Sequence, residues 1–182
     1  MRKQSTTLNV KSILFLENFL YDSKRALVDR FAAGVFLFAV YARARFGDLR
    51  RIAKVIVDEV QENKDESLGF LELHSDSHKM RATGNPLGAR LPQIAPIKGL
   101  GDRAWGRDFV EVARMTGLNL KEWIPGRPLL PAPTVIGDWS DRPTTSAEIG
   151  KWLRGILEQC PDFIPDGFTP HGCKATTLVM LS

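Results

Sequence analysis

The spacing of apolar residues predicts a long central helix early in the chain. From Lys24 to Ala42 apolar side chains recur every three or four residues, and the middle of this run is apolar on nearly all sides. A helix of this kind lies inside a fold rather than at its edge. Asp22 or Ser23 can cap it. A looser set of apolar residues predicts a shorter helix before it: Leu8, Ile13, Leu16 and Leu20.

A change of pattern after the long helix predicts a small antiparallel sheet. Residues 55–57 and 69–74 are short β-type runs, and the polar residues 61–67 between them are expected to form a turn. Residues 80–83 and 90–94 indicate one or two further strands. Together with the helices, these strands place the chain in the α+β class.

A short helix and a proline-rich segment come next. Residues 107–115 are predicted to be helical, and Gly117 would end the helix. Prolines recur through residues 121–143, so we expect a loop or an extended segment there. The segment does not resemble a free linker, because it carries enough apolar side chains to settle against the core: Trp123, Leu129, Leu130, Val135, Ile136 and Trp139.

Two further helices are predicted near the end of the chain. Thr145 followed three residues later by Glu148 is a capping box, and the helix that it begins has the clearest amphipathic pattern in the sequence. Thr169 and Pro170 are typical of the N-cap and first position of a last helix. No C-terminal helix signal precedes Ser182, so we expect the chain to stop within this helix.

The composition is that of one ordinary globular domain. The chain has 182 residues, 43% of them hydrophobic and 25% charged. We expect residues 1–5 to form a tail and residues 6–182 to form one domain that is incomplete at its C-terminus. The longest apolar stretch, residues 31–42, is too short to span a bilayer, so no membrane partner is expected. Cys160 and Cys173 are too few for a disulfide framework and indicate reduced thiols in an intracellular compartment.

The charge pattern favours an anionic partner. The net charge is +4, and five basic residues are clustered near the end of the long helix, with Asp48 as the only acid among them. Charge alone leaves two interpretations open, a solvated helix face or a surface that contacts phosphates. The five basic residues are Arg43, Arg45, Arg50, Arg51 and Lys54.

Three places in the sequence could carry chemistry. Arg45 at the end of the long helix is followed three residues later by Asp48, and Lys79 lies between two strand-like runs. His171 and Lys174 are three apart at a predicted helix start, so they share one face of that helix. Fixed cations and a histidine beside a helix N-terminus can cradle a phosphate.

The order of these parts resembles the catalytic domain of the tyrosine recombinases, the family that includes phage integrases. The motif Arg-x-x-Asp-Leu that begins at Arg45 is similar to the first box of that family. The motif Phe-Thr-Pro-His-Gly-Cys-Lys that ends at Lys174 is similar to the second box, which has arginine at its last position. Lys79 lies where the family carries a lysine on a β-hairpin. The resemblance covers residues 6–182 and implies a mainly helical domain with a small antiparallel sheet.

The resemblance also implies a role for each residue. Arg45 would grip the non-bridging oxygens of a DNA phosphodiester, and Lys174 would replace the second arginine. His171 would hydrogen-bond the phosphate or manage the proton of the attacking tyrosine, and Lys79 would protonate the departing 5′ oxygen. Asp48 would orient Arg45 or hold the local helix start. Neither a metal nor another cofactor is expected. The remaining cluster residues are expected to bind DNA: Arg43, Arg50, Arg51 and Lys54.

The nucleophile of the family is missing from this chain. Recombinases of this kind cleave and rejoin DNA strands through a 3′-phosphotyrosyl intermediate, and their tyrosine lies downstream of the second box. Here the tyrosines are Tyr21 and Tyr41, both before the first box. We therefore expect a C-terminally truncated recombinase that binds DNA but is inactive alone. Other recombinase protomers are candidate partners. Its location would be with DNA, in the nucleus of a eukaryote or otherwise in the cytoplasm.

Two other functions fit the same residues. The chain could be a non-enzymatic DNA-binding remnant of a mobile element that has kept the fold and lost the chemistry. It could also be an unrelated helical protein-interaction domain, in which Arg45 is an ordinary helix-end residue paired with Asp48. A zinc site is not expected, because the histidines and cysteines have no close paired spacing.

Overall fold

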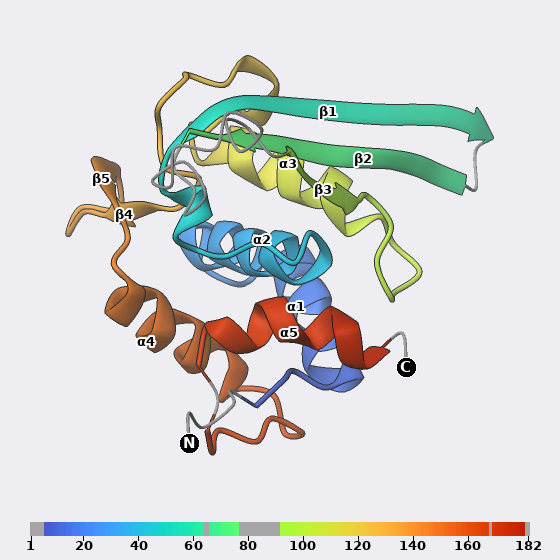
Figure 1. Cartoon of the computed structure of the whole chain (residues 1–182), viewed down its shortest axis with the longest axis vertical. Coiled ribbons are helices and arrows are strands. Elements are labelled where there is room, and N and C mark those ends of the chain that lie inside the picture. Colours follow the sequence, from blue (N-terminus) through green and yellow to red (C-terminus); the bar gives the residue numbers. More distant parts are fainter. Residues whose placement is uncertain (1–5, 64–65, 77–91, 168, 181–182) are drawn as a thin grey trace, which may run out of the picture.

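The computed structural model describes residues 6–63, 66–76, 92–167 and 169–180, and these form an α+β fold (Figure 1). Within these ranges the chain forms five α-helices, two short 3-10 turns and five strands. They are α1 (Val10–Tyr21), α2 (Leu27–Tyr41), the 3-10 turn η1 (Asp48–Arg50), β1 (Ile52–Asn63), β2 (Glu66–Ser75), β3 (Pro92–Pro96), α3 (Trp105–Met115), the 3-10 turn η4 (Leu120–Glu122), β4 (Pro131–Pro133), β5 (Trp139–Pro143), α4 (Ser146–Leu157) and α5 (His171–Met180).

Helix α2 is the centre of the core, as the sequence predicts. Every residue from Phe31 to Val40 is buried, and α1, α3, α4 and α5 all contact this helix. In Figure 1 it lies between the sheet and the C-terminal helices. A single apolar cluster runs from Leu8 to Cys173, so both ends of the described chain contribute to one core. Arg45 follows the C-terminal end of this helix, so the position of the helix decides where Arg45 lies.

The prediction for the start of α2 is wrong. The helix begins at Leu27 rather than Lys24, and neither Asp22 nor Ser23 caps it. Asp22 instead follows the last residue of α1, and its carboxylate accepts hydrogen bonds from the backbone N–H of Lys24 at 3.0 Å and the side chain of Arg25 at 3.1 Å. The Asp22 side chain therefore stabilises the turn between the two helices, and these hydrogen bonds compete with its use as a helix cap.

The predicted antiparallel sheet is confirmed, with strand order β1-β2-β3. The predicted turn over residues 61–67 is too long, because β1 continues to Asn63 and Gln61 pairs with Ser67. Ladder hydrogen bonds of a hairpin outweigh the polar character of such residues when the strands are already aligned. β3 confirms the strand expected at residues 90–94, whereas residues 80–83 lie outside the described residues.

The proline-rich segment is extended and mostly settled against the core. Trp123 and Trp139 donate their indole N–H groups to the carbonyls of Ile52 and Thr116, each at 3.0 Å. The segment also forms the small hairpin of β4 and β5. The prediction that Val135 and Ile136 are buried is wrong, because they lie at the tip of this hairpin and are 106% and 84% exposed. A two-stranded ribbon has too little surface to cover its own tip.

The helices near the C-terminus follow the predicted signals. Helix α4 begins with the complete capping box of Thr145 and Glu148, and its face with Ile149 and Leu153 is buried. Helix α5 begins at His171, one residue later than predicted, so Pro170 precedes the helix instead of being its first residue. Within the described ranges, no helix is long and apolar enough to cross a membrane.

Candidate phosphate-binding pocket

The end of helix α2 fixes the backbone on which Arg45 stands. The N–H of Ala44 bonds to the carbonyl of Ala39 at 3.0 Å, and the N–H of Arg43 bonds to the carbonyl of Val40 at 3.2 Å. This pair of bonds is a Schellman motif, which needs a left-handed residue after the helix. Arg43 supplies it with φ +53°, in a conformation that usually favours glycine. The motif turns the chain so that Ala44 is buried and Arg45 is exposed.

The start of helix α5 presents the second pair of predicted residues. His171 and Lys174 are one helical turn apart, with His171 exposed and Lys174 half-buried. The opposite side of this turn holds Cys173, which has no exposed surface. Burial raises the pKa of its thiol to about 12, so the sulfur stays neutral near pH 7 and serves as an apolar anchor for the helix. The anchor sets the direction of the two basic side chains.

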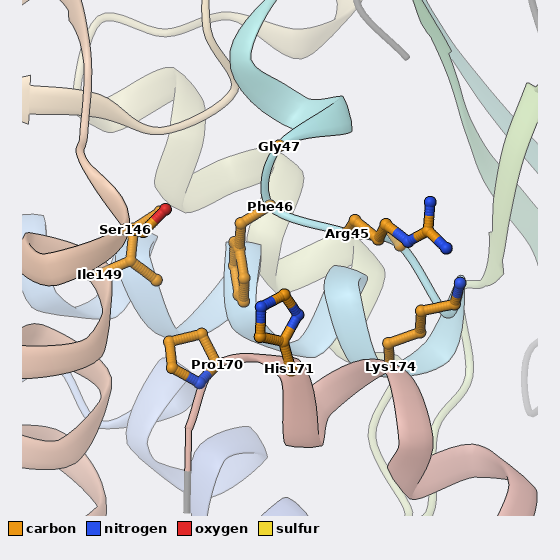
Figure 2. A pocket seen from close by; sticks show the side chains of 9 residues that line it. Arg45, Phe46, Gly47, Ser146, Ile149, Pro170, His171 and Lys174 are labelled. Atoms are coloured by element: carbon orange, nitrogen blue, oxygen red, sulfur yellow. The ribbon is translucent and has the colours of Figure 1, made fainter. Parts of the chain in front are cut away.

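Arg45, His171 and Lys174 meet at one pocket of about 290 Å³. In Figure 2 the head groups of Arg45 and Lys174 lie on one side of it, Phe46 and Ile149 lie on the other, and His171 stands between them. The structure therefore brings together three of the residues that the two sequence motifs predict. The complete lining is Ala44, Arg45, Phe46, Gly47, Ser146, Ile149, Pro170, His171 and Lys174.

The cations of the pocket have no acidic partner in the part of the chain that the structure describes. There, neither Arg45 nor Lys174 forms an ion pair or a side-chain hydrogen bond. Several other basic residues do have carboxylate partners: Lys11, Arg25, Arg103, Arg114 and Arg142. Two like charges that line one pocket repel each other, so an anion between them is favourable. The first residue of α5 adds the positive end of a helix dipole.

Asp48 does not pair with the arginine three residues before it. No ion pair joins Arg45 and Asp48 within the described residues; their link is the backbone hydrogen bond from the N–H of Asp48 to the carbonyl of Arg45, at 2.9 Å. Asp48 is the first residue of η1, and its carbonyl accepts a hydrogen bond from the hydroxyl of Ser75 in β2. Of the two roles that the sequence suggests, this placement favours holding the local turn.

The other basic residues of the cluster lie in the turn after α2 and along η1 and the start of β1. Their side chains are exposed, and within the described ranges none has an ion pair. They are Arg43, Arg50, Arg51 and Lys54. The surface next to the pocket is therefore positively charged. Lys79 and its surroundings lie outside the described residues.

Neither tyrosine of the chain lines the pocket. The hydroxyl of Tyr41 donates to the buried carboxylate of Glu17 at 2.5 Å, and that of Tyr21 donates to the carbonyl of Arg103 at 3.3 Å. Burial, and for Tyr41 also the bond to Glu17, raises the pKa of both phenols above the ordinary value of 10.0. Both tyrosines therefore have structural roles.

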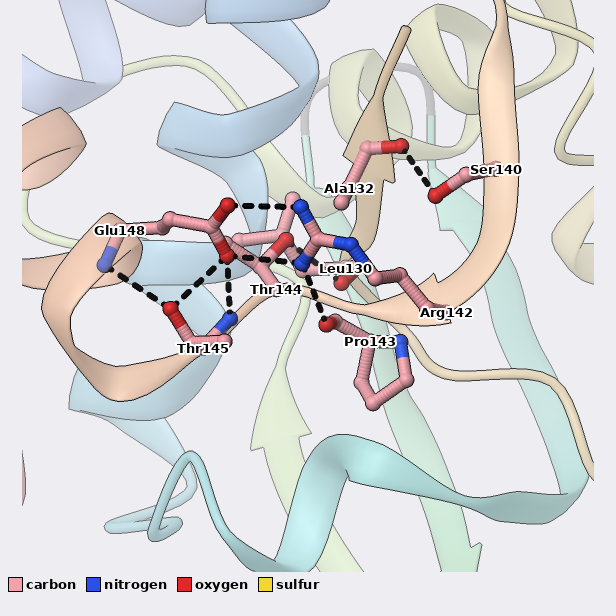
Figure 3. Close-up of polar contacts among 8 residues, drawn as sticks. All are labelled: Leu130, Ala132, Ser140, Arg142, Pro143, Thr144, Thr145 and Glu148. Atoms are coloured by element: carbon pink, nitrogen blue, oxygen red, sulfur yellow. Dashed lines mark hydrogen bonds and ion pairs between the residues drawn. The ribbon is translucent and has the colours of Figure 1, made fainter.

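The sequence does not predict two polar groups that hold elements of the fold together, one of them beside the pocket. Glu17 is 1% exposed and accepts hydrogen bonds from the N–H groups of Leu100 and Gly101 at 3.0 and 2.8 Å, which fastens a loop to α1. Arg142 forms two bonds of 2.8 and 2.7 Å to Glu148 at the capping box of α4 (Figure 3). For Glu17, the sequence signal is a carboxylate among the apolar positions of a predicted helix. For Arg142, the sequence gives no signal beyond the capping box itself.

The Arg142 bond fixes the wall that α4 contributes to the pocket. Glu148 also accepts a hydrogen bond from the backbone N–H of Thr145 at 2.8 Å, and the side chain of Thr145 accepts one from the backbone N–H of Glu148. These bonds fix the first turn of α4. Ser146 and Ile149, which line the pocket, belong to that turn or follow it directly. Hydrogen bonding from Arg142 and Thr145 holds the pKa of Glu148 well below its ordinary value of 4.5.

Comparisons with known protein families, with curated proteins and with solved structures find no match. Within the described ranges, no group of three or more histidine, cysteine, aspartate or glutamate side chains could hold a metal ion. A functional assignment therefore rests on the geometry of the pocket and on the two sequence motifs that meet there.

Proposed function

We propose that the chain is the DNA-binding portion of the catalytic domain of a site-specific tyrosine recombinase or integrase, with a DNA phosphate held in the pocket. The observation that carries the proposal is the meeting of Arg45 with His171 and Lys174, which come from distant motifs of the sequence. A guanidinium, an ammonium and an imidazole at a helix N-terminus suit a phosphate. The basic residues beside the pocket would contact neighbouring phosphates.

Each pocket residue has a distinct task in this proposal. Arg45 would bind two non-bridging oxygens with its planar fork, and Lys174 would add one point charge. His171 would donate a hydrogen bond to the phosphate or accept the proton of an attacking hydroxyl. Stabilisation of the transition state would be weaker than with two arginines, because an ammonium cannot bind two oxygens in one plane.

The chain on its own would bind DNA without cutting it. Both tyrosine hydroxyls are engaged elsewhere, and neither tyrosine lines the pocket. A tyrosine from another protomer, or from sequence outside this chain, would be required for cleavage. The same observation supports a second candidate, a non-enzymatic DNA-binding remnant of a mobile element. The recombinase proposal predicts a covalent DNA adduct when a protomer that carries the tyrosine is added, whereas the remnant would never give one.

The proposal is tested by measuring duplex DNA binding by fluorescence anisotropy over a range of salt concentrations. We expect affinity to fall steeply with salt, and the double variant Arg45→Ala/Lys174→Ala to reduce the slope of log K against log salt by about 1, because both side chains hold the same phosphate. The matched control is Arg114→Ala/Lys121→Ala, which removes the same charge from exposed residues that do not line the pocket.

Two results would contradict this proposal. One is binding that does not depend on salt, and the other is an equal loss of affinity in the pocket variant and the control. An equal loss would mean that surface charge in general, rather than the pocket, holds the DNA. DNA binding that the pocket variant leaves unchanged would instead favour the third possibility, a helical protein-interaction domain.

A further inference from the structure

The pocket has an apolar side as well as a cationic side. Its cationic side holds the head groups of Arg45 and Lys174, whereas its other side is formed mainly by aromatic, aliphatic and proline carbons, with Ser146 beside Ile149 (Figure 2). A phosphate ion alone would fill only the first side. The apolar residues are Ala44, Phe46, Ile149 and Pro170.

The apolar side is already assembled in the protein. Phe46 meets the ring of Phe36 edge to face, with the centroids 5.8 Å apart and the planes at 80°. Ile149 is 4% exposed and is held by the first turn of α4. Pro170 lies close to Gly150, where an added Cβ would be 3.6 Å from the proline ring. A wall supported in this way is pre-organised for a ligand and does not close over an empty site.

The size of the pocket limits what fits. At about 290 Å³ it is near the lower end of the range of roughly 300–1,000 Å³ for small-molecule sites. There is room for a phosphate and one attached ring. In a stacked duplex the bases point away from the backbone phosphates, so the apolar side would stay empty. An unstacked nucleotide can bring its ring back toward its own phosphate.

We infer that the pocket binds an unstacked nucleotide, with its phosphate between Arg45 and Lys174 and its base against Phe46 and Pro170. This inference rests on the proposed DNA-binding function and adds a preference to it. Aromatic and apolar side chains hold unstacked bases with little regard to sequence, because every base has a flat apolar face. The chain therefore favours single-stranded or frayed DNA over a closed duplex at this site.

The test is an NMR titration of the isotope-labelled full chain with three probes: thymidine 5′-monophosphate, inorganic phosphate and thymidine. We expect the monophosphate to bind at least about tenfold more tightly than either of its two parts, with shifts at the pocket residues. Phe46→Leu should remove about tenfold of that affinity while keeping an apolar core contact with Phe36. The matched control is Phe70→Leu on the exposed face of β2, where the ring is 52% exposed and does not line the pocket.

A second measurement needs no variant. Single-stranded oligothymidylate should bind more tightly than a duplex with the same number of phosphates. Equal affinity for thymidine monophosphate and inorganic phosphate would overturn the inference, and so would a preference for the duplex. The proposed function would survive both results as long as Arg45→Ala/Lys174→Ala still weakens DNA binding. If no DNA binds but the monophosphate binds through Phe46, the proposed function fails and a nucleotide pocket remains.

Discussion

Replacement of Arg43 by glycine should stabilise the protein. Arg43 has φ +53° in the Schellman motif after α2, and its side chain has no ion pair within the described ranges. A left-handed conformation costs a residue with a Cβ about 1–2 kcal/mol. Glycine loses about 0.5–1 kcal/mol more conformational entropy on folding. The difference predicts a gain of about 0.5–1 kcal/mol, or about 1–4 °C in Tm for a chain of this length.

Arg43→Ala is the control for this prediction. Alanine removes the same charge but keeps the Cβ, so its stability should stay within about 0.5 kcal/mol of the original chain. Urea denaturation of both variants gives the free energies of unfolding, and thermal melts give the Tm values. A glycine variant no more stable than the alanine variant would refute the argument that the left-handed turn is strained. Equal gains in both variants would assign the effect to charge instead.

Three further predictions concern the supporting groups. Glu17→Ala should lower the free energy of unfolding in urea by about 2–4 kcal/mol, because the Tyr41 hydroxyl and the N–H of Gly101 lose their acceptor and the N–H of Leu100 loses one of its two; a loss below about 1 kcal/mol would contradict the account. The folded-state pKa of Glu148 is lowered chiefly by Arg142, so its contribution is present above its ordinary pKa of 4.5 and is lost as the pH falls below that value. The Tm advantage over Glu148→Gln should therefore shrink as the pH falls, and a constant gap would oppose this. Cys173 should resist a thiol-reactive dye until the protein unfolds, and rapid native-state labelling, located by mass spectrometry, would disprove its burial.

The elements that the sequence predicts correctly are those with local signals. The run around Phe31–Val40 can only be a buried helix, and the capping box of Thr145 and Glu148 needs no partner outside its own turn. The presence of an antiparallel sheet could be predicted, because short runs rich in β-branched residues seldom form anything but strands. Its turn was misplaced because polar residues 61–67 remain compatible with strands once the hairpin is paired.

The site was predictable in its residues but not in its shape. The motifs at Arg45 and Lys174 are each only a few residues long, and only tertiary structure shows that they share a pocket. The apolar side with Phe46 could not be predicted, because its wall comes from a helix far along the chain. The left-handed conformation of Arg43 has no sequence signal, since a glycine would be expected there. The exposure of Ile136 depends on how the hairpin protrudes from the core.

The most direct measurement of the central claim is a double-mutant cycle for DNA binding with Arg45→Ala, Lys174→Ala and the combined variant. If both side chains grip one phosphate, each single variant should lose about tenfold in affinity, and the combined variant clearly less than a hundredfold, because loss of one partner already releases the phosphate from the other. Losses that simply multiply, or single variants that bind DNA as well as the original chain, would contradict a shared phosphate site.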